Sequence, residues 1–164
     1  MIKSLAFSFL WALTTLGYAA TQQYQDISLG NRQELRQKFY GGASINSFKD
    51  VTHAITWIGQ QSYQLRSKIT DDRKRRELLR MIHYEATRYQ LDPDLVLALI
   101  EVESGFNRFA LSHVGASGLM QVMPNTAKYV AKKIGMTNYT NDKLSDTNTN
   151  LTLGSNYLNM VLVD

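Results

Sequence analysis

The chain has 164 residues, enough for one domain or for one domain with an N-terminal appendage. Its 18 Lys and Arg side chains against 14 Asp and Glu side chains leave a net charge of +4, an excess too small to indicate a nucleic-acid-binding protein. It contains no cysteine, so we expect no disulfide, no thiolate metal site and no acylated cysteine.

Residues 1–19 have the layout of a secretory signal peptide. Lys3 gives a positive start, residues 5–16 are mostly apolar, and Gly17 and Ala19 place small residues just before a cleavage site. The alternative is a buried N-terminal strand or helix. The apolar run is too short for a comfortable membrane span, and no later stretch is apolar enough for one. We therefore expect an exported protein, periplasmic or extracellular, without an integral membrane anchor.

Residues 20–70 are predicted to form a polar leader followed by one helix. The leader ends at Gly41 and Gly42, a pair typical of a loop or linker. From residue 47 to about residue 68, apolar residues such as Ile55, Ile58 and Tyr63 recur at helical spacing. This pattern predicts an amphipathic N-terminal helix.

Residues 71–164 are predicted to form an all-α domain. Asp71 and Asp72 are typical of a helix start, and that helix should continue to Tyr89. Asp92 followed by Pro93 starts a third helix, because aspartate caps helices and proline suits the first helical position. Further helices are expected at 118–123, at 125–134 and from residue 146 onward. Strand patterns are nearly absent, so the fold class is all-α.

Two glutamates, Glu101 and Glu103, lie at the end of the third helix, and the helical period separates them. Glu103 continues the stripe formed by Val96, Leu99 and Ile100, whereas Glu101 points roughly the opposite way, toward water. We therefore expect Glu103 to be buried, and burial together with the helix dipole should raise its pKa. A carboxyl of that kind is a candidate proton donor. The alternative is a structural carboxylate bonded to the backbone or to an arginine.

The segment after Glu103 is rich in glycine and in neutral polar side chains, as a ligand cleft would be. Gly115 and Gly118 suit turns with positive φ or close backbone approach. Ser112 and Gln121 offer neutral donors and acceptors of the kind that hold sugar hydroxyl and acetamido groups. Each could equally be a turn or cap residue, and a methionine such as Met123 more often fills a core.

No Asp or Glu occurs from Ser104 through Asn141, whereas most glycoside hydrolases need two carboxyl groups. One acid suffices if an internal sugar hydroxyl replaces water as the nucleophile. The acid then protonates the glycosidic oxygen and, once ionised, takes the proton of that hydroxyl. No cluster of His, Asp or Glu has metal-ligand spacing, so no metal site is expected.

The segment from Glu103 onward resembles the signature of the soluble lytic murein transglycosylases (SLT domain), members of the goose-type lysozyme-like superfamily. A second family motif, an Asn followed by Gly and Tyr-Leu, is met near the end of the chain. The matching positions are Glu103, Ser104, Phe106, Asn107, Ser112, Gly115, Ala116, Gly118, Leu119, Met120, Gln121, Met123, Pro124, Thr126, Ala127, Asn150, Gly154, Tyr157 and Leu158.

The resemblance implies a lysozyme-like helical catalytic domain that cleaves peptidoglycan. Glu103 would be the sole catalytic acid and base, while Ser112, Gln121, Met123 and Tyr157 would line the glycan cleft. The enzyme would cut the β-1,4 bond between MurNAc and GlcNAc to leave 1,6-anhydro-MurNAc ends. It would use no metal and no cofactor. From the small net charge we expect it to bind no nucleic acid, and we also expect it to act as a monomer.

The family continues past its Tyr-Leu motif with another helix and an Ala-Tyr-Asn-Ala-Gly motif, whereas this chain stops at Asp164. We therefore expect the catalytic domain at 71–164 to be truncated at its C-terminus, whether as a fragment or as a variant. Two alternatives stay open. One is a muramidase that hydrolyses the same bond, and the other is a non-catalytic peptidoglycan-binding module.

Overall fold

The computed structural model describes residues 47–163. The predicted signal peptide at 1–19 and the leader up to residue 46 lie outside this part of the chain. Within it the structure contains only helices, turns and two isolated bridges, which confirms the predicted all-α class. The helices are α3 (Val51–Leu65), α4 (Asp72–Arg88), α5 (Pro93–Ser104), α6 (Pro124–Lys133), the 3-10 helix η2 (Asn141–Ser145) and α7 (Thr147–Val163).

Aspartate side chains start four of these helices. Asp50, Asp71 and Asp92 precede α3, α4 and α5, and each accepts a hydrogen bond from a backbone N–H in the first turn. Asp146 does the same before α7, where its Oδ1 accepts from the Thr149 N–H at 2.9 Å. Such a bond satisfies an N–H that has no partner inside the helix. These caps confirm the predicted starts of α4, α5 and α7 to within two residues, whereas α3 begins four residues later than predicted.

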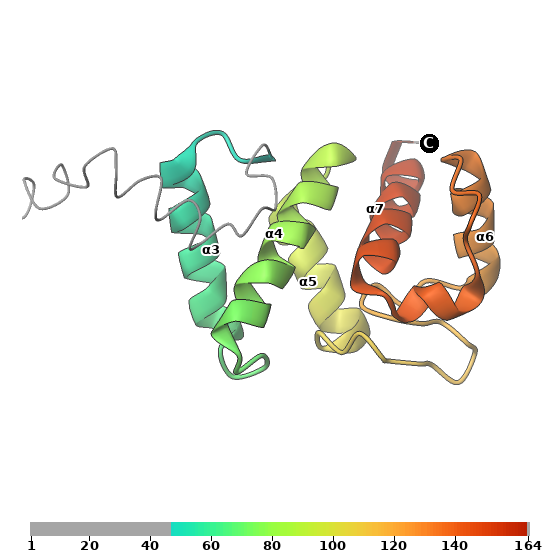
Figure 1. The fold of residues 1–164 in the computed structure, drawn as a ribbon, viewed down its shortest axis with the longest axis horizontal. Helices are drawn as coiled ribbons and strands as arrows, with labels where there is room; N and C mark the ends of the chain where they lie inside the picture. The colour runs from blue at the N-terminus through green and yellow to red at the C-terminus, as the bar shows by residue number, and fades with distance from the viewer. Residues whose placement is uncertain (1–46, 164) are drawn as a thin grey trace, which may run out of the picture. The chain divides into compact units, whose positions relative to one another are not determined.

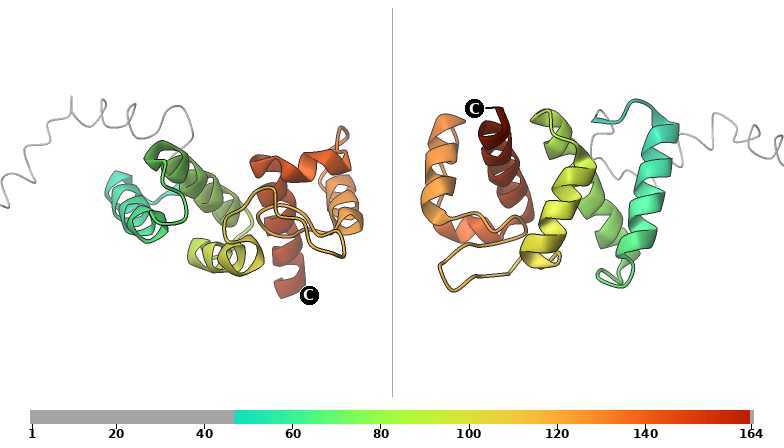
Figure 2. Two further views of the ribbon diagram at one scale, coloured as in Figure 1. Left: turned by 90° about the horizontal axis from the view of Figure 1, so that it is seen from below. Right: turned by 180° about the vertical axis from the view of Figure 1, so that it is seen from behind.

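Helix α4 contacts α3, α5 and α7, and α7 in turn contacts α6 and η2 (Figure 1). In both views of Figure 2 the segment joining α5 to α6 is a long loop without helix. The core that holds these helices together is aliphatic. Its most deeply buried large side chains are Leu79, Ile82, Val96, Ile100, Leu119, Val130, Leu144, Leu151 and Leu153.

The apolar pattern predicted for α3 matches its inward face only in part. Of the residues named in that pattern, Ile58 is buried, whereas Ile55 and Tyr63 are exposed, and Ala54 and Trp57 are buried as well. The Trp57 indole packs edge-on against the His83 ring of α4, with the centroids 5.0 Å apart. A large aromatic side chain therefore sets which face of α3 meets α4, and the pattern of β-branched and other apolar residues did not reveal it.

The short helix predicted at 118–123 is absent. Residues 118–121 form a turn, and Ser117 and Val122 on either side exchange two backbone hydrogen bonds of 3.1 and 3.0 Å. Gly118 and Gln121 have φ values of +80° and +46°, which a right-handed helix cannot contain. The turn brings Gln121 back toward the loop after α5.

Candidate active site

Glu103 lies in the last turn of α5, next to the residue that ends the helix. Gly105 takes a left-handed conformation with φ +56°, and its N–H donates to the Glu101 carbonyl at 3.1 Å. Glycine tolerates this conformation because it lacks a Cβ, so the chain can turn away sharply. The Glu103 side chain is therefore held at a helix end, beside the loop that carries the remaining predicted site residues.

The expectation that Glu103 is buried was wrong, because the side chain is exposed. The stripe itself is right along the helix, since Val96 and Ile100 are fully buried and Leu99 is half-buried. At the last turn no neighbouring side chain covers the stripe. Across from it, Met123 and Tyr157 are themselves 39% and 43% exposed. Glu103 thus stands at the edge of an open groove.

This groove has a volume of about 300 Å³. It is bounded by α5, by residues 120–123 at the end of the turn, by the start of α6 and by the C-terminal half of α7. Three of the four predicted substrate residues, Gln121, Met123 and Tyr157, line it together with Glu103. They come from three separate segments of the chain. Among the lining residues Glu103 is the only carboxylate or other charged side chain.

Ser112 is not brought into the groove, contrary to the expectation from the resemblance. Its Oγ accepts a hydrogen bond from the Ala116 N–H at 2.9 Å, and its own N–H donates to the Ala116 carbonyl at 2.9 Å. Ser112 therefore closes a tight turn in the loop after α5, the alternative role for a serine. In this structure it shapes the loop and does not line the pocket that holds Glu103.

Gln121 is held in place by the loop that it faces. Its Nε2 donates to the Ala110 carbonyl at 3.1 Å and to the Gly118 carbonyl at 2.9 Å. Its φ of +46° is uncommon for a residue with a side chain, and such conformations often mark functional sites. Gln121 thus ties the 118–121 turn to the loop while lining the groove.

The side chain of Asn150, on α7, holds the 118–121 turn in place, a role that we did not predict. Its side chain is buried and makes three hydrogen bonds, accepting from the Met120 N–H at 2.9 Å and donating to the carbonyls of Ser117 at 2.9 Å and Leu144 at 3.0 Å. A Cβ on Gly118 would lie only 2.5 Å from that Leu144 carbonyl oxygen. The turn can therefore approach α7 only with glycine at 118.

Gly154 is a second glycine that allows close approach in the groove. A Cβ at this position would lie 2.5 Å from Met120 Sδ and 2.9 Å from Met120 Cβ. Met120 is buried, so the absence of a side chain at 154 lets it lie directly on α7 under the groove. Leu99, Thr126 and Val161 also line the groove and were not predicted. The helical spacing of Gly154, Tyr157 and Val161 on α7 was the available signal.

The other acids and the candidate arginine partner lie elsewhere. Glu101 forms an ion pair with Lys68, in the turn that follows α3, with 2.7 Å between Oε1 and Nζ. Asp94 accepts from the Trp57 indole N–H at 2.9 Å. Within residues 47–163 no ion pair joins Arg108 to Glu103, and the Arg108 guanidinium lies 4.4 Å from the Phe109 ring centroid.

In the part of the chain that the structure describes, no three His, Asp or Glu side chains are grouped so that they could hold a metal ion. None of its helices has the length and hydropathy needed to cross a membrane.

Comparison with known proteins identifies relatives of this chain. The family model described as Transglycosylase SLT domain matches residues 80–163. A segment of 52 residues, 32% of this chain, is 48% identical to a protein of Actinobacillus pleuropneumoniae serotype 5b (strain L20) described as membrane-bound lytic murein transglycosylase C. A Haemophilus influenzae (strain PittEE) protein of the same description is 46% identical over 52 residues. The chain spans only 14% and 15% of the lengths of these two relatives.

Among solved structures, the lytic transglycosylase Slt of Pseudomonas aeruginosa, described as an inactive variant with one glutamate changed to glutamine, is 26% identical to this chain. The superposition has a TM-score of 0.50 and covers 84% of this chain and 24% of the other. These helices are therefore arranged as in a lysozyme-like SLT transglycosylase, which confirms the predicted fold.

Proposed function

The chain belongs to the Transglycosylase SLT domain family, and from this premise we propose that it cleaves the glycan strands of peptidoglycan without water, with Glu103 as acid and base. The observation that carries the proposal is the composition of the groove. It holds one carboxylate, at its edge, among apolar and neutral polar side chains. A reaction that needs a second carboxylate as nucleophile or base has no group for that purpose in this lining.

In the proposed reaction the Glu103 carboxyl donates its proton to the oxygen of the β-1,4 bond between MurNAc and GlcNAc. The bond from C1 of MurNAc to that oxygen breaks, and GlcNAc leaves with a free hydroxyl. The C6 hydroxyl oxygen of the same MurNAc then bonds to C1, and its proton passes to the Glu103 carboxylate. The product ends in 1,6-anhydro-MurNAc, and Glu103 returns to its starting state.

The groove is open and its lining is largely apolar, and both features suit a glycan strand as the substrate. The thioether of Met123 and the ring of Tyr157 offer surfaces for sugar faces, and Gln121 offers an amide at the wall. Exposure of Glu103 lets a long glycan strand reach it from solvent, and the bound sugars would then exclude water from the carboxyl. We further infer that the protein is exported, because its substrate lies outside the cytoplasm, and that it acts as a monomer without a cofactor.

The test is the mass of the muropeptides released from purified sacculi. An anhydro end is one water lighter than a hydrolysed end, so the two reactions give separable products. We expect anhydro products from the parent chain and a loss of about a thousandfold in rate for Glu103→Gln. The matched control is Glu101→Gln, two residues away on the same helix, which should retain the parent rate on glycan strands stripped of peptide. Hydrolysed ends would assign the muramidase reaction instead.

A non-catalytic peptidoglycan-binding module is the second candidate, favoured by one observation. Tyr157 and Val161 on α7 are 43% and 58% exposed, so the groove is open along that helix. This candidate predicts that the chain sediments with sacculi yet releases no muropeptide. It also predicts that Glu103→Gln binds sacculi as well as the parent does.

A further inference from the structure

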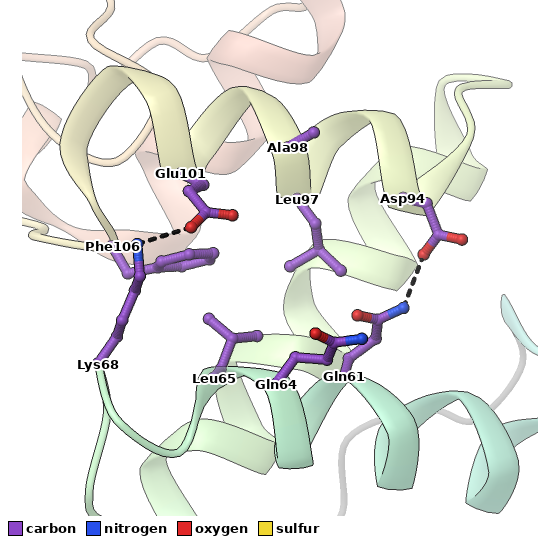
Figure 3. Close-up of a pocket in the computed structure, with 9 residues that line it drawn as sticks. All are labelled: Gln61, Gln64, Leu65, Lys68, Asp94, Leu97, Ala98, Glu101 and Phe106. Carbon is purple, nitrogen blue, oxygen red and sulfur yellow. Dashed lines mark hydrogen bonds and ion pairs between the residues drawn. The ribbon is translucent and has the colours of Figure 1, made fainter.

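A second pocket lies between α3 and α5 (Figure 3). Its volume is about 250 Å³. Leu97, Ala98 and Glu101 face it from α5, and the helical period places Glu101 about 200° around α5 from Glu103. The pocket and the groove therefore occupy opposite sides of one helix. The α3 wall precedes the matched segment at 80–163, whereas the α5 wall lies within it.

The walls of the pocket combine an apolar floor with amide groups. Leu65 from α3 and Leu97 from α5 are both buried and point toward each other across the pocket (Figure 3). The carboxamides of Gln61 and Gln64 extend from α3 along one side, and the Phe106 ring lies at the other end. Methyl groups and amides of a ligand would each find a matching surface here.

The two ends of the pocket differ in charge. Asp94 and Glu101 are seven residues apart on α5, which separates them by about 10 Å along the helix. Asp94 Oδ1 accepts from two neutral donors, Trp57 Nε1 at 2.9 Å and Gln61 Nε2 at 3.1 Å, and no cation among the described residues pairs with it. Glu101 is paired with Lys68 at 2.7 Å. The pocket is therefore negative at the Asp94 end and neutral at the other, on a chain whose net charge is +4.

We propose that this pocket binds the amine-bearing end of a peptidoglycan stem peptide, a proposal that rests on the proposed function. The ligand's ammonium group meets Asp94, and its peptide groups meet Gln61 and Gln64. Its methyl groups lie on Leu65 and Leu97.

The test is a titration of the full chain, followed by NMR, with an N-terminally acylated stem tetrapeptide whose diaminopimelate amine is free. The same peptide with that amine acetylated is the second probe. We expect the free amine to bind about fivefold more tightly, the range of a solvent-exposed charge pair. Asp94→Asn should remove this preference while keeping an oxygen that accepts from Trp57. Asp142→Asn, a matched change on η2 outside the pocket, should keep it.

Equal affinity for the two peptides, or no binding of either, overturns the proposal, as does an unchanged preference in Asp94→Asn. If Asp94→Asn fails to fold, Gln64→Ala replaces it, because Gln64 is exposed and its loss should weaken the binding of both peptides. Glycan strands stripped of peptide separate this inference from the proposed function. The parent and Asp94→Asn should cleave them at the same rate, and failure of the parent to cleave them would reject the proposed function alone.

Discussion

The two sides of α5 carry pockets of similar size that treat their carboxylates differently. On the α3 side, Glu101 is bonded to Lys68 and Asp94 to Trp57. On the α7 side, Glu103 has no ion pair or side-chain hydrogen bond with any described residue, and most of the side chains that line its groove are apolar. A carboxylate with a bonded partner is a structural or binding group, whereas one left unpaired at a groove is available to a substrate.

The groove side depends on Asn150, and removing its side chain should produce the largest change in stability. Asn150→Ala leaves the Met120 N–H and the carbonyls of Ser117 and Leu144 without their partner. Because buried polar groups left unpaired are costly, we expect a loss of about 3 to 4 kcal/mol in the free energy of unfolding. Denaturant melts measure it.

The matched control for this change is Asn148→Ala, on the exposed surface of the same helix, which should cost less than about 0.5 kcal/mol. Equal losses in the two variants would show that Asn150 does not hold the turn. The change should also lower activity more than the stability loss alone explains, since the turn positions Gln121 in the groove.

The helix starts could be predicted from the sequence, whereas the hydrogen bonds that Asn150 makes to the turn could not, and the reason is physical. An aspartate cap acts within four residues, so Asp71, Asp92 and Asp146 can be read locally. Asn150 bonds to groups up to 33 residues away. In the sequence, an Asn three residues into a helix looks like any polar surface residue. Only the folded chain brings the 118–121 turn against it. Local chemistry was predictable, and contacts across the chain were not.

The same distinction explains why Glu103 is exposed and why the helix predicted at 118–123 is a turn instead. The helical period placed Glu103 correctly on its stripe, but exposure depends on what lies across from the helix end. Gly118 was expected to allow close approach, as it does, yet the positive φ of Gln121 could not be foreseen because glutamine seldom adopts it. The resemblance named four cleft residues, of which three line the groove, and Ser112 shows that a motif residue can serve the loop instead.

The packing between α3 and α4 depends on the buried His83 ring, and lowering the pH should reduce the stability of the fold. The His83 ring stacks on Phe48 with centroids 3.5 Å apart, and its Nδ1 lies 3.0 Å from Ser47 Oγ. Burial, aided by nearby His53 and opposed by Asp94, lowers the pKa of His83 from 6.5 to about 4. Below pH 6.5 the unfolded chain therefore takes up a proton that the folded chain does not. Stability should fall by about 2 to 3 kcal/mol as the pH drops from 6.5 to 4.

Thermal melts of the parent and His83→Gln across this range measure the effect, which should be much smaller in the variant. His53→Gln is the control, because His53 is exposed beside the same ring. If the parent and His83→Gln lose stability in parallel as the pH falls, the buried ring is not the group responsible.

Glu85 is buried on α4, and its ionisation should lower the free energy of unfolding as the pH rises. It is 2% exposed, its Oε2 has no hydrogen-bond partner, and burial raises its pKa despite Arg88 and a hydrogen bond from Thr152. Its neutral form is favoured in the folded chain, so its contribution is present at low pH and is lost as the pH rises through the raised pKa. Glu85→Gln should therefore gain about 1 kcal/mol at neutral pH and nothing near pH 4. A gain that is the same at both pH values would contradict this account.

The smallest effect concerns the pair that distinguishes Glu101 from Glu103. Lys68 and Glu101 are 40% and 55% exposed, so solvent screens their attraction, and a double-mutant cycle with Lys68→Met and Glu101→Gln should give a coupling below about 1 kcal/mol. The coupling should vanish at about 1 M salt, where the screening length is about 3 Å. A coupling that is large and insensitive to salt would mean that the pair helps to hold α5 in place. Glu101→Gln would then disturb Glu103 indirectly, whereas a weak coupling leaves it a clean control for the proposed catalytic role.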